Sequence, residues 1–566
     1  MFVKITKSGP RQYVQIVEAY RDEKGKPRQR TLATLGRREQ LNSLKAVHTG
    51  LSRILGMVKP ESNKATPIFD SSRAFGDVWA LTLIWKQMKL DSLREILRIR
   101  TRHKINLEAL LRIMVLNRLC DADSKLGVLR WLQTVSFPNM DVVSVSHQQL
   151  LRTMDAIVEN QEVIEKVLAE AVGEFVGEEL SIIFYDLTTV RVEGEARLSG
   201  DVRRFGMSKD GVIARQFMLG LVQTADGVPL YHEVFEGNTA EIKTLKSSLE
   251  KALSRFPVKR VIAVADRGLL SIDNLEELKS IVLPGGQVLE FILAIPGRRY
   301  SEFAELLEPI NEAARQSLKP EIFGECMWQD LRLVVAHNQL QAKEQRIKRD
   351  EQIASLERQA ALWVGKLDMQ DTGSRSRGRK LSDGGVRARF YHAVSEARLS
   401  RIIRVDLKSE LFAYDIDHKA LELARAIDGK LLLVSNTPDL CAHEIVDRYK
   451  SLADIERSFK VLKSEIEIGP VYHRLPERIR AHALICFMAL VLHRIMRSRL
   501  QKQPVAKIVS PERALTSLRR IQTHRMTLQG QKTSVTGIST INEEQFAILR
   551  SIKVRKPTIN DGYINL

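Results

Sequence analysis

Two short apolar runs that each end in an aspartate constrain the fold of this chain most. The runs are LSIIFYD (180–186) and VIAVAD (261–266), and turn-like sequence follows both. Their β-branched and aromatic residues predict buried strands. An Asp in such a place often only forms a turn or caps a helix, so each has a structural explanation by itself. Together, Asp186 and Asp266 predict two carboxylates at strand ends.

The sequence around these runs predicts a mixed α/β domain. Two apolar stretches, 216–223 and 228–235, are joined through Ala-Asp-Gly (225–227), and Asp-Gly is a strong signal for an antiparallel hairpin. The remaining elements are expected at about 239–255 (helix), 272–280 (helix) and 290–295 (strand).

A third carboxylate lies in the stretch YKSLADIERSFKVLK (449–463), which predicts one amphipathic helix. Tyr449, Glu456 and Lys463 recur every seven residues, and at about 100° per residue they fall on one narrow stripe. A Glu beside a Lys on such a helix is most often simply solvated, but the two aspartates upstream make Glu456 a candidate for the third carboxylate of one site. A neighbouring stripe has the spacing of a core-facing edge and consists of Ile445, Leu452, Ile455, Phe459, Leu462 and Ile466.

Three converging carboxylates repel one another and raise one another's pKa unless cations lie between them. Mg²⁺ binds carboxylate oxygens, keeps several waters and bridges to phosphate. Two such ions about 4 Å apart stabilise the attacking and leaving oxygens of an in-line phosphoryl displacement. Asp186, Asp266 and Glu456 are therefore the candidate catalytic and metal-binding residues, and Glu465 and Glu444 are the next carboxylates to test if Glu456 is not the third ligand.

In order and spacing, these residues resemble the DDE transposases of bacterial insertion sequences, specifically the branch with the signature Y-x2-R-x3-E-x6-K. Tyr449, Glu456 and Lys463 match this signature, whereas Leu452 stands where the Arg is expected. The resemblance extends from the first residues to about residue 500. It includes DLTT (186–189), GMSKDG (206–211), FEGN (235–238), DRGL (266–269), DGKLLLVSN (428–436), GPVYHR (469–474) and RIRAH (478–482).

The resemblance implies an α/β fold with a ribonuclease H-like catalytic core, in which helices flank a mixed sheet. The expected order of three antiparallel strands, helix, strand, helix, strand and helix agrees with it. In that fold the first and fourth strands are neighbours, which would bring Asp186 and Asp266 to one sheet edge. The long separation of Asp266 from Glu456 predicts an inserted, partly β subdomain.

We expect six regions along the chain. Residues 1–60 form a basic N-terminal hairpin module with strands at 13–17 and 28–35, and residues 61–177 form a helical DNA-binding region with helices at 107–119 and 161–175. The core has a first part (178–296) and a second part with the catalytic Glu helix (429–500), separated by the inserted subdomain (297–428), which has a helical arm at 339–367. A basic C-terminal region (501–566) follows. Within the insertion, 372–385 is expected to be a surface loop that phosphate could order, and Trp328 is expected to pack in the core rather than stack on a base.

Basic charge is concentrated at the two ends of the chain. The net charge is +19, and the sequence pI is about 9.7. Residues 1–60 hold 13 Lys and Arg against 4 Asp and Glu, and residues 494–566 hold 14 against 4. Clustered Lys and Arg neutralise phosphates, so both ends are expected to bind a polyanion; a solvated basic surface is the alternative.

The four cysteines lie far apart and form no CxxC pair, which argues against structural zinc and disulfides and favours a reducing cytoplasm. The start of the chain, MFVKITKSGP, has no apolar run, so no secretory signal is expected. The apolar run at 484–492 is too short to span a bilayer and predicts a core helix. The expected location is the bacterial cytoplasm, in association with the nucleoid, without a membrane.

The function implied by the resemblance is that of a DNA transposase, which binds the ends of its insertion sequence and catalyses metal-dependent strand cleavage and strand transfer. It implies two Mg²⁺ ions per site, for which Mn²⁺ can substitute, and as partners the inverted-repeat ends, target DNA and a second copy once the ends are paired. The implied DNA contacts are Tyr449, Lys460, Lys463, Arg267, Thr188 and Lys209. A purely structural role stays open for Tyr449 and Lys463.

Two other functions remain open. A ribonuclease H-like nuclease would keep the three carboxylates and use water alone as the nucleophile; the large insertion and the two basic ends argue against it. A non-catalytic DNA-binding descendant would have lost one carboxylate, and all three are present.

Overall fold

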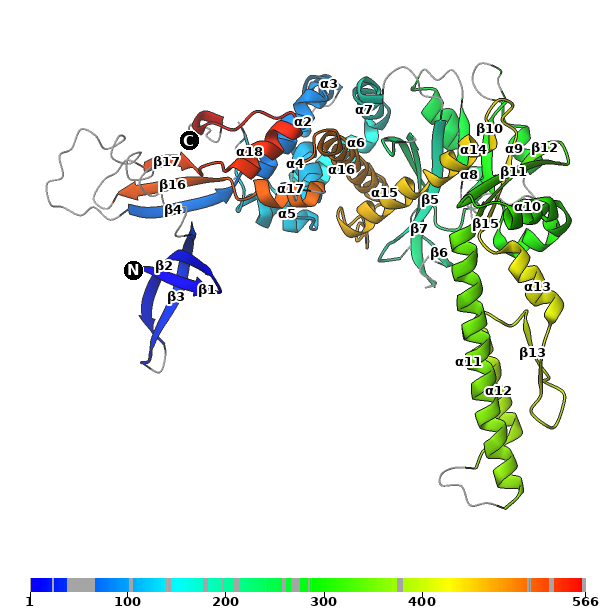
Figure 1. The fold of residues 1–566 in the computed structure, drawn as a ribbon. Coiled ribbons are helices and arrows are strands. Elements are labelled where there is room, and N and C mark those ends of the chain that lie inside the picture. Colours follow the sequence, from blue (N-terminus) through cyan, green and yellow to red (C-terminus); the bar gives the residue numbers. More distant parts are fainter. Residues whose placement is uncertain are drawn as a thin grey trace. The chain divides into compact units, whose positions relative to one another are not determined.

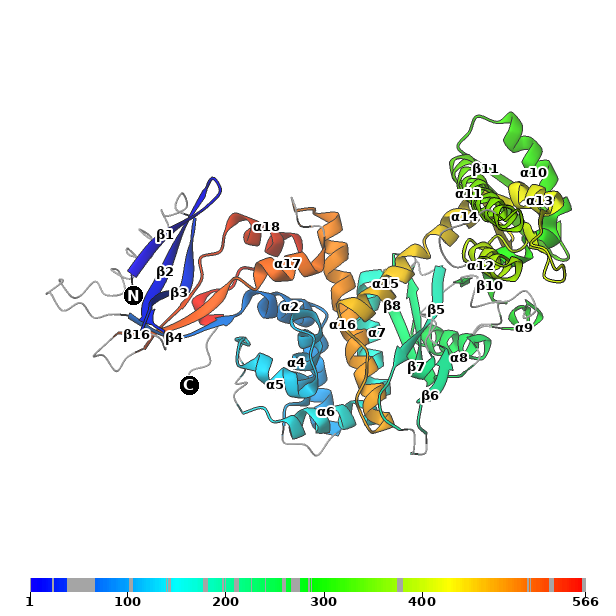
Figure 2. The same ribbon diagram turned by 90° about the horizontal axis from the view of Figure 1, so that it is seen from below.

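The structure is a computed structural model of the 566-residue chain (Figures 1 and 2). It describes residues 2–22, 25–37, 67–100, 105–138, 140, 144–176, 182–195, 198, 200–207, 213–224, 226–239, 241–256, 261–265, 275–282, 286, 288–373, 380–505, 508, 510–528 and 534–561. Two compact units emerge, one of residues 1–70 with 526–535 and one of residues 71–525 with 536–566.

The first unit contains a three-stranded antiparallel sheet. Its strands are β1 (Phe2–Ser8), β2 (Arg11–Arg21) and β3 (Pro27–Arg37), in the order β1-β2-β3. The predicted hairpin of 13–17 with 28–35 is confirmed, because β2 and β3 pair along most of their length. Strand β1 is an addition that the sequence pattern did not predict; it turns into β2 at Gly9, whose φ of +58° suits a glycine.

A nine-stranded mixed sheet forms the centre of the second unit, which confirms the α/β class. The order is β11-β12-β15-β10-β9-β5-β7-β6, and β8 also pairs with β7. The strands are β5 (Ile182–Arg191), β6 (Arg204–Met207), β7 (Ile213–Thr224), β8 (Pro229–Glu236), β9 (Ile262–Ala265), β10 (Glu290–Ala294), β11 (Glu321–Trp328), β12 (Leu331–Asn338) and β15 (Lys430–Ser435).

Within this sheet, β5 lies between β7, to which it is antiparallel, and β9, to which it is parallel. The prediction that the two strands leading to the aspartates are neighbours in the sheet is therefore confirmed. Helices α8 (Glu241–Leu253) and α9 (Leu275–Lys279) follow β8 and β9 in the chain, as the sequence predicts.

Helices precede the sheet in the sequence, and one later helix packs between them and the sheet. The early helices are α2 (Gly76–Gln87), η2 (Leu90–Ser92), α3 (Leu93–Arg100), α4 (Leu107–Cys120), α5 (Lys125–Leu132), α6 (His147–Glu159) and α7 (Gln161–Val176), which confirms the helices predicted at 107–119 and 161–175. Helix α16 (Pro476–Lys502) contacts α4 and α6 as well as β8 (Figures 1 and 2).

The predicted core helix around 484–492 is this helix α16. In the part of the chain that the structure describes, it is the one helix long and apolar enough to cross a membrane, but 94% of its apolar window is buried inside the protein. Its apolar surface therefore serves the core.

The region 297–428 contains a long helical arm, as predicted. Helix α11 (Gln339–Asp371) projects from the sheet and packs against α12 (Asp383–Glu396) (Figure 1). Phe390 is fully buried in a separate core with Ile353 and Leu356. Trp328 packs edge-on against Phe303 at 5.4 Å, which agrees with the expected core role. The other elements are η4 (Gly297–Phe303), α10 (Ala304–Gln316), β13 (Ile403–Val405), β14 (Tyr414–Ile416) and α13 (His418–Ile427).

The stretch 449–463 is not one helix, so the prediction of a single helix is wrong. Helix α14 (Ala442–Lys450) ends before Ser451, and α15 begins after Leu452 (Ala453–Ser464). The Ser451 Oγ donates to the Asp447 carbonyl at 3.0 Å, and the Leu452 amide bonds the Tyr449 carbonyl, three residues back rather than four. This tight turn interrupts the helix.

The C-terminal elements complete the fold. They are α17 (Pro511–Leu518), β16 (Gln522–Leu528), β17 (Ser534–Ile538), α18 (Glu543–Ser551) and η5 (Ile559–Asp561). Strands β17 and β16 form a three-stranded sheet with β4 (Pro67–Ala74).

Candidate active site

The two strands that lead to the predicted aspartates run side by side in the same direction. The pairing of β5 with β9 runs as far as Phe184 with Val264. Asp186 lies in β5, two residues beyond Phe184, and β9 ends at Ala265, the residue before Asp266. Asp266 itself and the side chain of Asp186 lie outside the described residues. The backbone thus brings the Asp186 position to the carboxyl end of β9.

Residues around Asp186 make β5 a central, buried strand. Tyr185 and Leu187 are fully buried, and Asp186 pairs with Leu221 of β7. Gly220 on β7 gives the Tyr185 ring its space, since a Cβ there would lie 2.8 Å from the Tyr185 Oη. The strand is therefore paired on both edges up to Phe184 and on the β7 edge at Asp186.

Helix α15, which carries Glu456, is fixed to the sheet by a buried polar contact. The Ser458 Oγ donates to the Gln223 Oε1 at 2.6 Å and accepts a hydrogen bond from the Arg494 guanidinium of α16. Gln223 on β7 is the partner of Phe184 on β5, and α15 also contacts β5 directly. The tether lies two residues from Glu456, whose side chain is outside the described residues.

The predicted apolar stripe on this segment is confirmed where it is described. Ile445, Phe459, Leu462 and Ile466 are buried, and Leu452 is only 8% exposed. The Ile455 side chain lies outside the described residues. Leu452 thus has a packing role at the position where the resemblance leads one to expect an Arg.

The residues expected to contact DNA are in different environments. Lys460 and Lys463 are exposed on α15, whereas Tyr449 is half-buried on α14 and packs against the core. Thr188 is buried in β5, so its hydroxyl is not open to DNA here. Arg267 and Lys209 lie outside the described residues.

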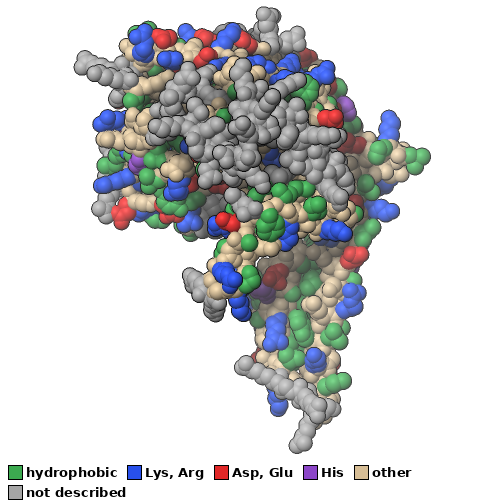
Figure 3. Space-filling view, turned by 90° about the vertical axis from the view of Figure 1, so that its left-hand side faces the viewer, with side chains coloured by type: hydrophobic (Ala, Val, Ile, Leu, Met, Phe, Trp, Pro, Cys, Tyr) green, Lys and Arg blue, Asp and Glu red, His purple; other side chains and the backbone are tan. Residues whose placement is uncertain are grey.

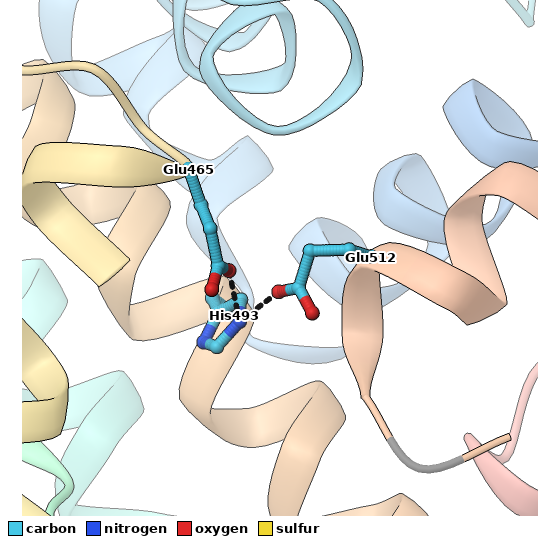
Figure 4. A group of neighbouring side chains, drawn as sticks. All are labelled: Glu465, His493 and Glu512. Carbon is cyan, nitrogen blue, oxygen red and sulfur yellow. Dashed lines mark hydrogen bonds and ion pairs between the residues drawn. The ribbon is translucent and has the colours of Figure 1, made fainter. Parts of the chain in front are cut away.

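A second polar cluster, which the sequence pattern did not predict, joins three helices (Figure 4). His493 on α16 is 2% exposed, and its Nε2 lies 2.6 Å from Glu512 Oε1 and 3.2 Å from Glu465 Oε2. Glu465 is the residue after α15, and Glu512 is in the first turn of α17. No short spacing links the three residues in the sequence, so no motif signals them.

Glu465, His493 and Glu512 form a group that could hold a metal ion, since their ligand atoms all lie within 4.8 Å of one another. Two atoms bound to one ion at about 2.1 Å each are typically near 3 Å or more apart. The separation of 2.6 Å between His493 and Glu512 is instead a direct hydrogen-bond length. The geometry favours a charged histidine between two carboxylates.

The pKa shifts in this cluster agree with that assignment. Burial alone would lower the pKa of His493, but the hydrogen bonds to Glu465 and Glu512 outweigh it and leave that pKa raised. Burial raises the pKa of Glu465. Burial also acts to raise the pKa of Glu512, but hydrogen bonds with His493, Glu465 and Ser510 outweigh it and lower that pKa strongly. The cluster therefore links the end of α15 to α16 and α17 through a proton on His493.

Comparison with known families identifies two parts of the chain. Residues 3–61 match the N-terminal domain of the IS1634 family of transposases, and residues 177–492 match the transposase DDE domain. No curated protein matches the chain. The DDE match includes β5, β9, α14, α15 and most of α16, and it covers more than half of the chain. The chain therefore belongs to the DDE transposases of insertion sequences.

Proposed function

We propose that this transposase binds the ends of its insertion sequence and catalyses metal-dependent DNA strand cleavage and strand transfer, with Asp186, Asp266 and Glu456 as metal ligands. The observation that carries the proposal is the register of β5 and β9. Asp186 and Asp266 each follow the paired residues Phe184 and Val264 by two positions. In a parallel pair, residues equally far beyond a paired couple are neighbours.

The position of α15 supports Glu456 as the third ligand. The helix contacts β5, and Ser458 ties it through Gln223 to the strand that pairs with β5. Glu456 precedes Ser458 by about half a helical turn. A tether this close to a ligand restricts its position, which a site that must hold two cations requires.

Divalent metal dependence follows from the family, and the proposed donors suit Mg²⁺ or Mn²⁺ because all three are carboxylates. Two such ions, when bound, would stabilise the charge that develops on the attacking and leaving oxygens. Asp186 and Asp266 would hold them from the sheet and Glu456 from the helix. The chain's own contribution is to bring three negative groups together and to present the DNA phosphate to them.

DNA contacts in this proposal come from exposed basic residues. Lys460 and Lys463 follow Glu456 on α15 and are exposed, so they can reach phosphates beside the cut; Tyr449, Arg267 and Lys209 are further candidates. Thr188 is left out because it is buried. Figure 3 shows Lys and Arg side chains spread over the face it draws and along the projecting arm. A second copy would join when two ends are paired.

We also propose that residues 178–296 and 429–500 form a ribonuclease H-like core, with 297–428 inserted into it. The order of strands and helices supports this interpretation, with β5, β7, β8 and β9 as the first four strands and the short β6 as an addition between the first two. Strands β11 and β12 of the insertion extend the same sheet through β15. The insertion is therefore continuous with the core.

The experiment is a cleavage assay on a labelled duplex of the element's end with Mg²⁺ or Mn²⁺. Asp186→Asn, Asp266→Asn and Glu456→Gln should each reduce nicking by at least a hundredfold, because each removes a charge that holds the cations. End binding should persist. The double variants should be no worse than the single ones, because one loss already empties the site.

Glu467→Gln is the matched control, since this glutamate is exposed close to the end of α15; it should cut normally. Joining of the cut end to a second duplex separates a transposase from a nuclease that only hydrolyses. Normal nicking by Glu456→Gln would move the third ligand elsewhere.

A further inference from the structure

The two-stranded ribbon formed by β6 and the start of β7 has an exposed apolar face. Phe205, Met207 and Ile213 are 63%, 68% and 70% exposed. Met207 pairs with Ile213, and Phe205 pairs with Arg215. Opposite residues of an antiparallel pair point to the same side, as do residues two apart in a strand. These four side chains, the ribbon face, therefore lie together.

The ribbon is held firmly at its other face and at its base. A Cβ on Gly206 would lie 2.4 Å from the Gln216 Nε2, so no side chain fits there, and that same nitrogen donates to the Gly237 carbonyl at 3.0 Å. At the base, the buried Arg203 donates from Nε to Asp201 Oδ1 at 2.9 Å and from Nη2 to the Arg474 carbonyl at 3.0 Å. The ribbon face is thus fixed in an exposed position.

Positive charge accompanies the apolar side chains. The Arg215 guanidinium lies 4.9 Å from the centre of the Phe205 ring and donates to the Gly194 carbonyl at 2.6 Å. Neither contact cancels its charge. Arg191 and Arg204 flank the ribbon in surface ion pairs with Glu193 and Glu236 at 2.8 and 2.9 Å, which are weak enough to exchange for phosphates.

The ribbon extends from the sheet on the side of the proposed active site. Strand β5 runs on from Asp186 to Arg191, which pairs with Gln216, and the ribbon continues from there to Ile213 (Figure 1). Five to eight residues at about 3.3 Å each correspond to roughly 17–26 Å. A duplex rises about 3.4 Å per base pair, so this is a distance of about five to eight base pairs.

We propose that the ribbon face enters the minor groove of the duplex held at the active site, about five to eight base pairs from the cut, and unstacks a base step there. The proposal rests on the proposed function. Phe, Met and Ile are the kinds of side chain that wedge between base steps, and Arg accompanies them in the minor groove. Three apolar side chains are too few for an interface with a second copy, in which each partner buries about 800 Å².

The test uses end duplexes with the fluorescent base 2-aminopurine at successive positions, bound by the Asp186→Asn protein so that the DNA stays intact. At saturation, fluorescence should rise at least threefold at one or two positions five to eight base pairs from the cut. Adding Phe205→Ala or Met207→Ser should remove at least two thirds of that rise with the same melting temperature. Arg215→Gln should weaken end binding at least threefold. Phe546→Ala, which alters an exposed Phe of α18, should change nothing.

An unchanged fluorescence rise in Phe205→Ala, or no rise at any position, would overturn the inference. Nicking by the wild-type protein in the same experiments would show that the proposed function still holds. A DNA-free dimer that Phe205→Ala converts to a monomer would assign the face to a second copy and also overturn it. If the wild-type protein neither binds nor nicks the end duplex, the proposed function fails and the inference fails with it.

Discussion

At the residue scale, Leu452 separates what periodicity can predict from what it cannot. The apolar spacing predicts that Leu452 is buried, and it is. The same spacing predicts one helix through this point, and that is wrong, because the Ser451 hydroxyl bonds back to Asp447 and a tight turn follows. Side-chain burial depends on spacing over several turns, whereas this interruption is confined to Ser451 and Leu452, where a side-chain hydrogen bond competes with the regular helical pattern.

Replacing Leu452 by Arg should destabilise the protein by about 3–5 kcal/mol, because it puts an unpaired charge into a buried position. Denaturant unfolding followed by circular dichroism measures this. Ser464→Arg, at the exposed last residue of α15, should be nearly neutral. A Leu452→Arg protein as stable as its parent, with stronger end binding, would show instead that the position faces DNA.

At the scale of elements, strand and helix order could be predicted around the proposed site, but contacts between distant elements could not. The strands that lead to Asp186 and Asp266 and the arm α11 follow from local pattern. The strand end predicted at Asp186 is wrong, because β5 continues through Asp186 to Arg191, and the short strand β6 was not predicted. The cluster of Glu465, His493 and Glu512 does not, because three helices meet only in the folded chain. The tether of Ser458 to Gln223 has the same origin, since the two residues are far apart in sequence.

The His493 cluster predicts a stability that falls as the pH rises above about 6.5. The folded pKa of His493 is raised above an unfolded value of about 6.5. Its stabilising contribution is therefore fully present below about pH 6.5 and is lost as the pH rises through the folded pKa. The groups that face His493 are the carboxylates of Glu465 and Glu512.

Melting temperatures between pH 6 and pH 9 test this prediction. The wild-type protein should lose more stability over that interval than His493→Gln, which has no proton to lose. His392→Gln is the control, because that histidine is exposed on α12. Parallel curves for wild type and His493→Gln would contradict the charged-histidine assignment.

The hydrogen bond between Ser458 and Gln223 predicts that a variant can lose DNA cutting while it keeps DNA binding. Ser458→Ala removes a buried hydrogen bond between α15 and the sheet, and it should reduce nicking about tenfold or more because the helix that presents Glu456 loses its register. End affinity should stay within about twofold, since it depends on basic residues elsewhere. A gel-shift and a nicking assay on one preparation measure both. Equal loss of both would indicate general unfolding.

At the scale of the whole molecule, the concentration of basic residues at the two ends can be read from the sequence, but the pairing of strands that lie far apart in the chain cannot. The basic N-terminal region contains the sheet of β1, β2 and β3 in a unit of its own, to which residues 526–535 also belong. The expected separate insertion shares a sheet with the core through β12 and β15. Pairing between strands so far apart in sequence has no local signal.

Deleting residues 1–60, which hold 13 Lys and Arg against 4 Asp and Glu, should weaken end binding and flatten its salt dependence. For every phosphate that these residues neutralise, the deletion should make the slope of log affinity against log salt shallower by about 0.9. Fluorescence anisotropy at salt concentrations from roughly 50 to 300 mM gives the measurement. An unchanged slope would remove this region from the DNA interface.

Cation binding by Asp186, Asp266 and Glu456 can be measured without relying on activity. Fe²⁺ in place of Mg²⁺, with ascorbate and peroxide, generates radicals that cut the polypeptide next to the bound ion. Mass spectrometry of the fragments should place the breaks close to residues 186, 266 and 456, and excess Mg²⁺ should suppress them. Breaks close to residues 465, 493 and 512 instead would put the ion in the cluster of Glu465, His493 and Glu512 and contradict the proposed metal site.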